Sequence, residues 1–470
     1  MRASIRVACV QLAARDVEES ERSLAEAVDA ATAAGGDADL VILPEATYPG
    51  YVLHEAEPWL DAEVFERACK AFADVAVDTG CALAVGIARP AGGSLLNSAL
   101  LFDTAGSVIS ITDKSFLWHF DARWFAPGRP GDVVELEWGR VGMFVCADAR
   151  MMEVPRRLAI LGADLLVDCT ALVLGPAGVN AQIEYMLGVR AWENASFLAV
   201  ANKCGFEAGI AHYAGRSAIY APSGECLVEA PSDEPSTIFA DLELGERPPF
   251  PVPRGEDGYP RLAAPRETLE IAAALERTPP VQPLRLALVR PPVPPRATLA
   301  ELGADLAIGP MIPPWDEALS IEGDQVVFGD ERRSSGEIVE FDEARIGILT
   351  GYRGAVPEEM RSLMLRGAAL VVWAGMEVLP PAPLLRTRAD ENRTNLVAIT
   401  AQGRWSAWSA TGTPLGAGPS AGLDAILVEI PLALAWHKEM APGTDVVRGR
   451  RPEHYSELAR ADRGARDQSA

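Results

Sequence analysis

The chain has 470 residues, 49% of them apolar, and a formal net charge of −24. This length predicts two or three domains with sizeable cores. The negative charge argues against nucleic-acid partners and against binding to anionic membranes, because both kinds of binding need basic patches.

Cysteine and histidine spacing argues against structural metal or disulfide chemistry. The seven cysteines include no CxxC pair and there is no HxxxH pair, so we expect neither a metal site nor a disulfide framework, and no cofactor. Apolar runs are interrupted by Asp164 and Asp168 before they reach membrane-spanning length, and the N-terminal stretch lacks a secretion signal. These features predict a cytoplasmic protein.

The N-terminal half alternates expected strands with expected helices. The apolar periodicity predicts strands at 5–12, 38–43, 81–87, 98–102, 107–112, 133–137, 141–145, 163–167, 197–202, 217–220, 226–229 and 237–242. It predicts helices at 16–34, 61–79, 154–161 and 179–195. This mixture of alternation and hairpins predicts an α/β fold with helices on the outer faces of two mixed sheets.

Three residues whose side chains could take part in catalysis each follow an expected strand. Glu45 comes after strand 38–43, where α/β sheets place their chemistry, although a solvated loop glutamate is the alternative. Lys114 follows strand 107–112 and is one of only four lysines among 42 basic residues, which favours a position that requires a compact ammonium. Cys146 directly follows strand 141–145 and precedes a helix start, a position where a thiol gains thiolate character. The alternative interpretation is a small buried cysteine without a chemical role.

An aromatic stretch, SFLWHFDARWFAPG, follows the lysine and contains Asp121. Aromatic side chains at this density form either core or the wall of a pocket. Because the stretch lies between strands, we take Trp118 as a candidate substrate-binding residue, together with Tyr51 and Thr170.

The C-terminal half repeats the N-terminal half in shorter form. RIGILT at 345–350 is similar to RVGMFV at 140–145, and four further segments correspond in the same order. Met311 stands at the position of Glu45, and Gly351 at the position of Cys146. We expect a catalytic domain at 1–245, a Pro-rich linker at 246–283, a degenerate copy without the chemical residues at 284–456, and a polar tail at 457–470.

Three stretches together carry a family resemblance: LPEATYPGY around Glu45, TDKSFLW around Lys114, and CADARMMEVPR from Cys146. They resemble the nitrilase superfamily of carbon–nitrogen hydrolases, in the amidase and carbamoylase branch. The resemblance implies an α–β–β–α sandwich, a Glu–Lys–Cys triad formed by Glu45, Lys114 and Cys146, and a supporting acid at Asp121. It also implies hydrolysis of a small amide or N-carbamoyl compound through a cysteine thioester, with the backbone N–H of Ala147 beside Lys114 at the oxyanion.

The resemblance further implies dimers made by stacking two sandwiches. The second copy would then replace the partner in an intramolecular pseudo-dimer, with a further homo-oligomer left open. Alternatives for the function are a Cys–His hydrolase that uses His119 or His212, a binding or scaffold protein on a retired hydrolase fold, and a thioester-based acyltransferase.

Overall fold

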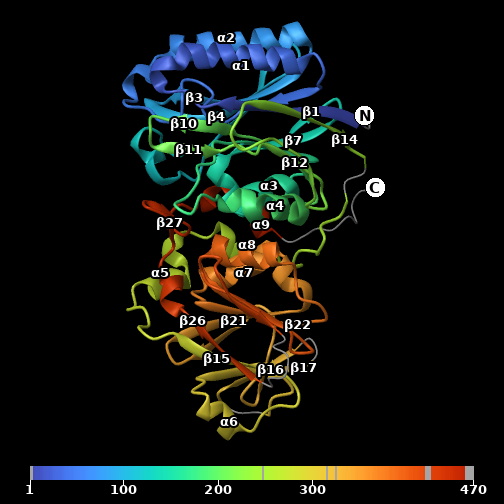
Figure 1. Cartoon of the computed structure of the whole chain (residues 1–470), viewed down its shortest axis with the longest axis vertical. Helices are drawn as coiled ribbons and strands as arrows, with labels where there is room; N and C mark the ends of the chain where they lie inside the picture. Colours follow the sequence, from blue (N-terminus) through green and yellow to red (C-terminus); the bar gives the residue numbers. More distant parts are fainter. Residues whose placement is uncertain (1–3, 246–247, 314–315, 323–324, 419–424, 461–470) are drawn as a thin grey trace. The chain divides into compact units, whose positions relative to one another are not determined.

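The computed structural model describes residues 4–245, 248–313, 316–322, 325–418 and 425–460 (Figure 1). The chain forms two compact units: unit 1 comprises residues 1–251 and 449–457, and unit 2 comprises residues 252–448 and 458–470. Most of the expected polar tail, residues 461–470, lies outside the described residues. Within the described part of the chain, no helix has both the length and the apolar character needed to cross a membrane.

The first sheet of unit 1 is mixed, and two helices cover its outer face (Figure 1). Its strands are β1 (Ser4–Ala13), β2 (Leu40–Ile42), β3 (Ala82–Ala91), β4 (Ser94–Phe102), β5 (Val108–Asp113), β10 (Lys203–Glu207), β11 (Ala211–Ala214) and β14 (Ser236–Glu243). Strands β1, β2 and β3 are parallel, and β4 and β5 continue as antiparallel neighbours. The helices α1 (Ser20–Gly35) and α2 (Ala62–Thr79) bury their apolar faces against this sheet, which makes the first core of unit 1.

The second sheet of unit 1 packs against the first and carries its own pair of helices (Figure 1). Its strands are β6 (Val134–Leu136), β7 (Gly139–Val145), β8 (Leu165–Cys169), β9 (Phe197–Ala201), β12 (Ala218–Tyr220) and β13 (Cys226–Glu229). The helices α3 (Glu153–Ile160) and α4 (Leu187–Asn194) cover its outer face. Unit 1 therefore has four layers in the order α–β–β–α, as expected for the fold class.

Two local features of unit 1 differ from the sequence prediction. Strands β10 and β11 were not predicted, because both are short, β10 contains Gly205, and Phe206 is exposed, so the apolar pattern is weak. The single expected helix at 179–195 is split into a π-helical turn at Gln182–Met186 and α4. Turns of this type are often found at functional sites.

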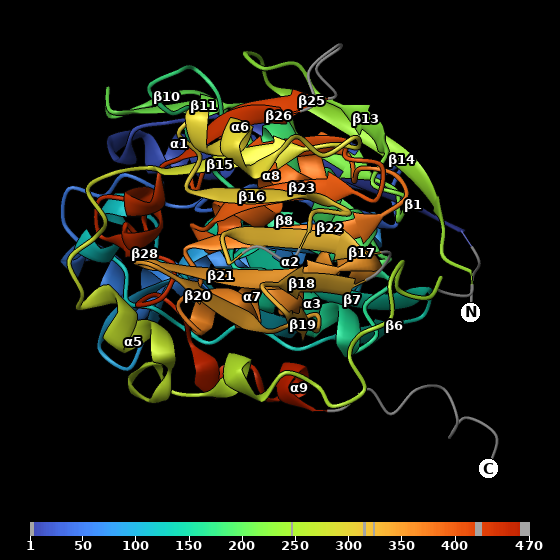
Figure 2. The ribbon, with the colours of Figure 1, turned by 90° about the horizontal axis from the view of Figure 1, so that it is seen from below.

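Unit 2 contains two mixed sheets whose strand order follows that of unit 1 (Figure 2). One sheet contains β15 (Leu284–Val289), β16 (Leu306–Pro310), β17 (Ala318–Glu322), β18 (Gln325–Phe328), β19 (Glu331–Arg333) and β26 (Ala425–Ile430). The other contains β20 (Ile338–Phe341), β21 (Ala344–Thr350), β22 (Leu370–Met376), β23 (Asn395–Thr400), β24 (Trp405–Trp408) and β25 (Pro414–Gly418). The parallel and antiparallel pairings recur in the same sequence as in unit 1, and helices α7 (Pro357–Leu365) and α8 (Ala382–Asn392) flank the second sheet.

Two segments outside the sheets complete the units. The region expected to be a linker contains α5 (Glu270–Leu275), and its residues from 252 onward belong to unit 2, where Arg254 Nε donates to Glu358 Oε1 at 2.7 Å. Residues 449–457 belong to unit 1, where Arg450 Nε donates to Glu153 Oε1 at 3.2 Å. Each unit is therefore discontinuous in sequence.

Candidate active site

A buried ammonium lies between two buried carboxylates at the strand ends of unit 1. Lys114 Nζ lies 2.7 Å from Glu45 Oε1 and 2.7 Å from Asp121 Oδ2. All three side chains are fully buried. Burying three charged groups is costly unless they are paired and hydrogen-bonded, so this arrangement is a strong indication of a functional site.

Backbone contacts between neighbouring strands hold Glu45 and Lys114 in place. The N–H of Lys114 donates to the carbonyl oxygen of Asn97 on β4 at 2.7 Å, and the Asn97 side-chain amide donates to Glu45 Oε1 at 2.6 Å. Gly86 on β3 lies so close to the chain after β2 that a Cβ there would be 2.4 Å from the Cα of Glu45. Only glycine permits this approach, which places the Glu45 carboxylate beside the lysine.

Cys146 sits on a sharp turn between β7 and α3. Its backbone has φ of +53°, a conformation that costs a non-glycine residue energy and is found repeatedly at active sites. The N–H of Cys146 donates to Asp168 Oδ1 at 2.7 Å, and its carbonyl oxygen accepts from Gln182 Nε2 at 3.0 Å. These two contacts hold the strained turn, and Ala147 follows in the short 3₁₀ helix that it opens.

The electrostatic environment of Cys146 keeps its thiol protonated at rest. Burial raises the pKa of Cys146 well above its usual value, and the nearby Glu45 carboxylate raises it further, while Lys114 opposes both effects. The helix start beside Cys146 was expected to give the thiol thiolate character, but desolvation of the buried sulfur has the larger effect on its pKa. The thiol needs a base before it can react.

Lys114 keeps its charge in the same environment. Burial disfavours the ammonium, but the carboxylates of Asp121 and Glu45 hold the pKa of Lys114 well above its usual value. The lysine is thus a fixed cation at neutral pH and is not available as a base.

Asp121 is held by the residues of the aromatic stretch. The Tyr51 hydroxyl donates to Asp121 Oδ1, and the N–H of Trp118 donates to Asp121 Oδ2 at 2.8 Å. The Tyr51 ring also faces Lys114 Nζ, at 5.4 Å from its centroid, and the Trp118 ring stacks on the Arg150 guanidinium at 4.6 Å. Thr170 is buried beside Cys146, and its carbonyl oxygen accepts from the N–H of Glu45 at 3.3 Å.

The two histidines considered as alternative bases lie on the surface. His119 is exposed and packs edge-on against Phe120, and His212 is exposed and stacks on Phe206 at 3.9 Å. Neither belongs to the buried group around Lys114. In the described part of the chain, no three His, Cys, Asp or Glu side chains are arranged to hold a metal ion.

Sequence reasoning missed three polar residues of the site: Asn97, Asp168 and Gln182. For Asn97 and Asp168 the available signal was a polar side chain in an otherwise buried strand, whereas Gln182 lies in the π-helical turn, where the sequence pattern gave no such signal. Asp168 shows this most clearly, since it is fully buried on β8 and burial raises its pKa well above the usual value.

Comparison with known proteins gives the class of the chain. The carbon–nitrogen hydrolase family profile matches residues 6–249, which is about half of the chain, and the chain belongs to this family. It is 33% identical over 216 residues to a nitrilase of Pyrococcus abyssi, an alignment that covers 44% of this chain and 78% of the nitrilase. It is 30% identical over 249 residues to an (R)-stereoselective amidase of a Pseudomonas species, covering 52% of this chain and 86% of the amidase.

Among solved structures, an amidase from Nesterenkonia sp. is 31% identical to this chain. That match covers 52% of this chain and 92% of the amidase, with a TM-score of 0.47.

Proposed function

We propose that unit 1 hydrolyses a small amide or N-carbamoyl compound through a thioester on Cys146, with Glu45 as the acid–base and Lys114 as the cation that stabilises the oxyanion. The observation that carries the proposal is the 2.7 Å contact between Lys114 Nζ and Glu45 Oε1, in a fully buried group that interacts electrostatically with the Cys146 thiol. Membership of the carbon–nitrogen hydrolase family supports the reaction class.

The raised pKa of the thiol makes the first proton transfer the central requirement. Glu45 takes the proton of Cys146, and the thiolate attacks the amide carbon to form a tetrahedral oxyanion. Glu45 then gives that proton to the departing nitrogen, so ammonia or an amine leaves and the thioester remains. A carboxylate that first accepts and then donates a proton can protonate the nitrogen as it leaves, which a leaving group as poor as ammonia requires.

The second half of the reaction reverses these steps with water. Glu45 takes a proton from water as the oxygen attacks the thioester carbon, and it returns that proton to the sulfur as the acid is released. Lys114 and the backbone N–H of Ala147 face the oxyanion in both halves. Removing one such donor typically costs about 100- to 1000-fold in rate.

Asp121 is proposed to act through Lys114 and not directly on the substrate. Its contacts with Tyr51, Trp118 and Lys114 fix the direction of the ammonium. Tyr51, Trp118 and Thr170 remain candidates for the walls that contact the acyl group. The Ala147–Asp148 pair after the cysteine favours an amide or carbamoyl substrate over a nitrile, because nitrilases of the family usually have Trp–Glu at these positions.

We also propose that unit 2 is a degenerate copy of unit 1 without catalytic activity of its own. Its strands pair in the same order and direction, and Gly351 keeps a positive φ of +57° at the turn that corresponds to Cys146. Met311, at the position of Glu45, is exposed, and no cysteine occurs after Cys226. The intramolecular pairing of the two copies stays a prediction.

The test is a panel of small aliphatic amides, N-carbamoyl amino acids and nitriles assayed for ammonia release by the full chain. Acid and ammonia in equal amounts from amides or carbamoyl compounds support the proposal. Transfer of the acyl group to added hydroxylamine or an amine in preference to water would favour the acyltransferase. Absence of turnover, together with iodoacetamide labelling of Cys146 no faster than that of the other cysteines, would favour a retired scaffold.

A further inference from the structure

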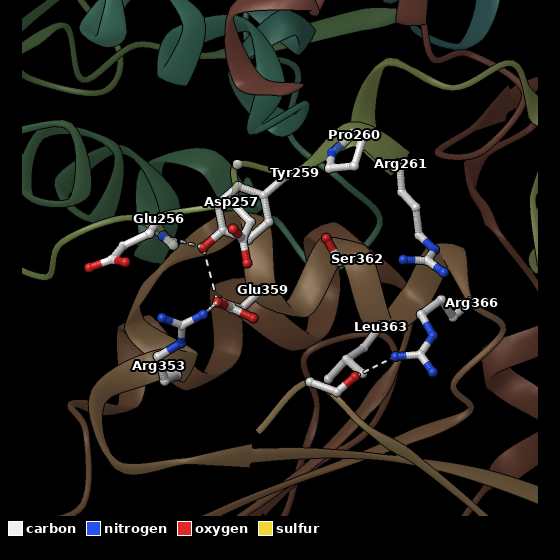
Figure 3. A pocket seen from close by; sticks show the side chains of 13 residues that line it. Glu256, Asp257, Tyr259, Pro260, Arg261, Arg353, Glu359, Ser362, Leu363 and Arg366 are labelled. Carbon is white, nitrogen blue, oxygen red and sulfur yellow. Dashed lines mark hydrogen bonds and ion pairs between the residues drawn. The ribbon is translucent and has the colours of Figure 1, made fainter. Parts of the chain in front are cut away.

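Unit 2 contains a pocket between α7 and the segment that precedes α5 (Figure 3). Its volume is about 330 Å³, within the range of small-molecule sites. Arg261 and Arg366 lie on one side of it, and Arg353, paired with Glu359, lies on the other. The pocket is distinct from the site in unit 1.

The corresponding place in unit 1 is filled by an ion cluster on α3. Arg157 Nη1 donates to the carbonyl oxygen of Gly131 at 2.8 Å. The same guanidinium binds Asp132, and its Nε lies 3.1 Å from Glu457 Oε2. Unit 1 thus supplies both the cation and its carboxylate partners from within itself.

Matching contacts establish which residues of unit 2 correspond to this cluster. In each unit an arginine binds a buried glutamate at the start of the helix and stacks on a tyrosine five residues later: Arg450 with Tyr455 at 5.9 Å, and Arg254 with Tyr259 at 5.6 Å. The residue two positions after the tyrosine is Glu457 in unit 1 and Arg261 in unit 2. A carboxylate in one unit is therefore replaced by a guanidinium in the other.

The arginine that follows this pattern occupies a different position on helix α7 of unit 2 than on α3 of unit 1. The alignment of RSLMLRG at 361–367 with RRLAILG at 156–162 places Ser362 at the position of Arg157, and the small side chain leaves the space that forms the pocket. Arg366, one helical turn further on, reaches the carbonyl oxygen of Gly336 in the way that Arg157 reaches Gly131. Unit 2 therefore keeps the arginine–carbonyl contact and an acidic residue after that glycine, Glu337, but Arg261 replaces the carboxylate of Glu457.

Arg366 lies in a partly buried group of arginines. Burial lowers the pKa of Arg366 and the neighbouring Arg261 and Arg345 lower it further, while the carboxylates of Glu270 and Glu337 only partly oppose this shift. Its side-chain hydrogen bond in the described structure goes to a neutral carbonyl group. Arg261 lies 3.3 Å from Glu270, but both are exposed, and pairs of that kind contribute little to stability and are easily exchanged.

We propose that this pocket binds a small carboxylate anion, whose oxygens occupy the place that Glu457 holds in unit 1, between the guanidinium groups of Arg261 and Arg366. Guanidinium groups bind carboxylates through paired hydrogen bonds, and the Ser362 hydroxyl lies close enough on α7 to line the same side. The inference uses the proposed relation between the two units and does not depend on the hydrolytic function of unit 1.

The experiment is calorimetric titration of the full chain with sodium propionate and sodium succinate, with sodium phosphate and sodium chloride as the other anions. We expect a carboxylate to bind, and Arg366→Gln and Arg261→Gln each to weaken that binding about 10- to 100-fold. The matched control is Arg332→Gln, an exposed arginine of unit 2 outside the pocket, which should leave binding unchanged.

A second variant tests the site independently, in case Arg366→Gln does not fold. Ser362→Leu fills the space on α7 without adding a charge and should abolish binding, with the thermal transition preserved. Carboxylate binding that is unchanged in both Ser362→Leu and Arg261→Gln would overturn the site. Phosphate or chloride binding as tightly as the carboxylates would overturn the assignment of the ligand class. Amide hydrolysis, measured separately, reports on unit 1 alone.

Discussion

Lys114 Nζ and Glu45 Oε1 lie 2.7 Å apart, and the two residues are 69 positions apart in the sequence. They come from the ends of β5 and β2, and neither side chain has access to solvent. The pair connects a fixed cation to the carboxylate that has to accept the thiol proton, so each partner should be tested by the substitution that alters it least.

Lys114→Arg should reduce turnover by at least about 100-fold, although the positive charge is kept. The planar guanidinium cannot fit between Glu45 and Asp121 in a space that holds a compact ammonium at 2.7 Å from both. The measurement is kcat on the best amide of the panel, with Lys70→Arg as the control, since Lys70 is an exposed residue of α2 paired with Asp74. Near-normal turnover in Lys114→Arg would remove the oxyanion role.

Cys146→Ala should abolish turnover and leave the thermal transition nearly unchanged, because it removes one sulfur atom from a site where the thiol is neutral at rest. Cys226→Ala is the control, since that thiol is exposed. Intact-mass analysis of the wild-type chain during turnover should detect an acyl adduct that Cys146→Ala lacks. Persistent ammonia release from the alanine variant would contradict thiol chemistry.

Gly86→Ala should lower both activity and stability, the latter by about 1–3 kcal/mol, since an added methyl group would overlap the chain at Glu45. Its Cβ would lie 2.3 Å from the carbonyl oxygen of Pro44. Gly36→Ala is a matched control, because a Cβ there meets nothing within 4 Å and its φ is −63°. Equal behaviour of the two variants in urea unfolding would show that the backbone approach is not limiting.

His119→Ala and His212→Ala should each keep near-normal turnover, because both histidines are exposed and lie outside the buried group. The pH profile of kcat/KM is the more discriminating measurement. Loss of an ionisation step from this profile in either variant would support the Cys–His alternative.

The titration of Asp148 should make the free energy of unfolding depend on pH. Burial raises its pKa from 3.8 to about 6, against the opposing hydrogen bonds from Ser115 and Phe116. A carboxyl group with a raised folded-state pKa contributes stability that is complete below the unfolded pKa and is lost as pH rises through about 6.

Asp148→Asn removes this contribution. The free energy of unfolding of the wild type should therefore fall relative to that of the variant between pH 4 and pH 7, by up to roughly 3 kcal/mol. Urea titrations at four pH values measure the difference. A difference that stays constant across this range would show that the carboxyl group titrates normally.

The strand ends that carry Glu45, Lys114 and Cys146 could be predicted because each is marked by a local apolar run with a polar residue after it. Asn97 and Asp168 could not, since their importance comes from contacts with residues 52 and 22 positions away. The direction of the pKa shift of Cys146 could not be predicted for a related reason. Local spacing shows the helix start beside Cys146, but only the packed structure shows how completely the sulfur is desolvated.

Arg450 and Glu457 belong to unit 1, although about 200 residues of unit 2 separate them from Pro251. They place a guanidinium on Glu153 and a carboxylate on Arg157, both on the helix that follows the cysteine turn. During synthesis unit 1 is therefore not complete when its first 251 residues have been made, since residues 449–457 follow the long first segment of unit 2. A chain that ends at residue 251 would lack the contacts that residues 450 and 457 make with the helix after Cys146.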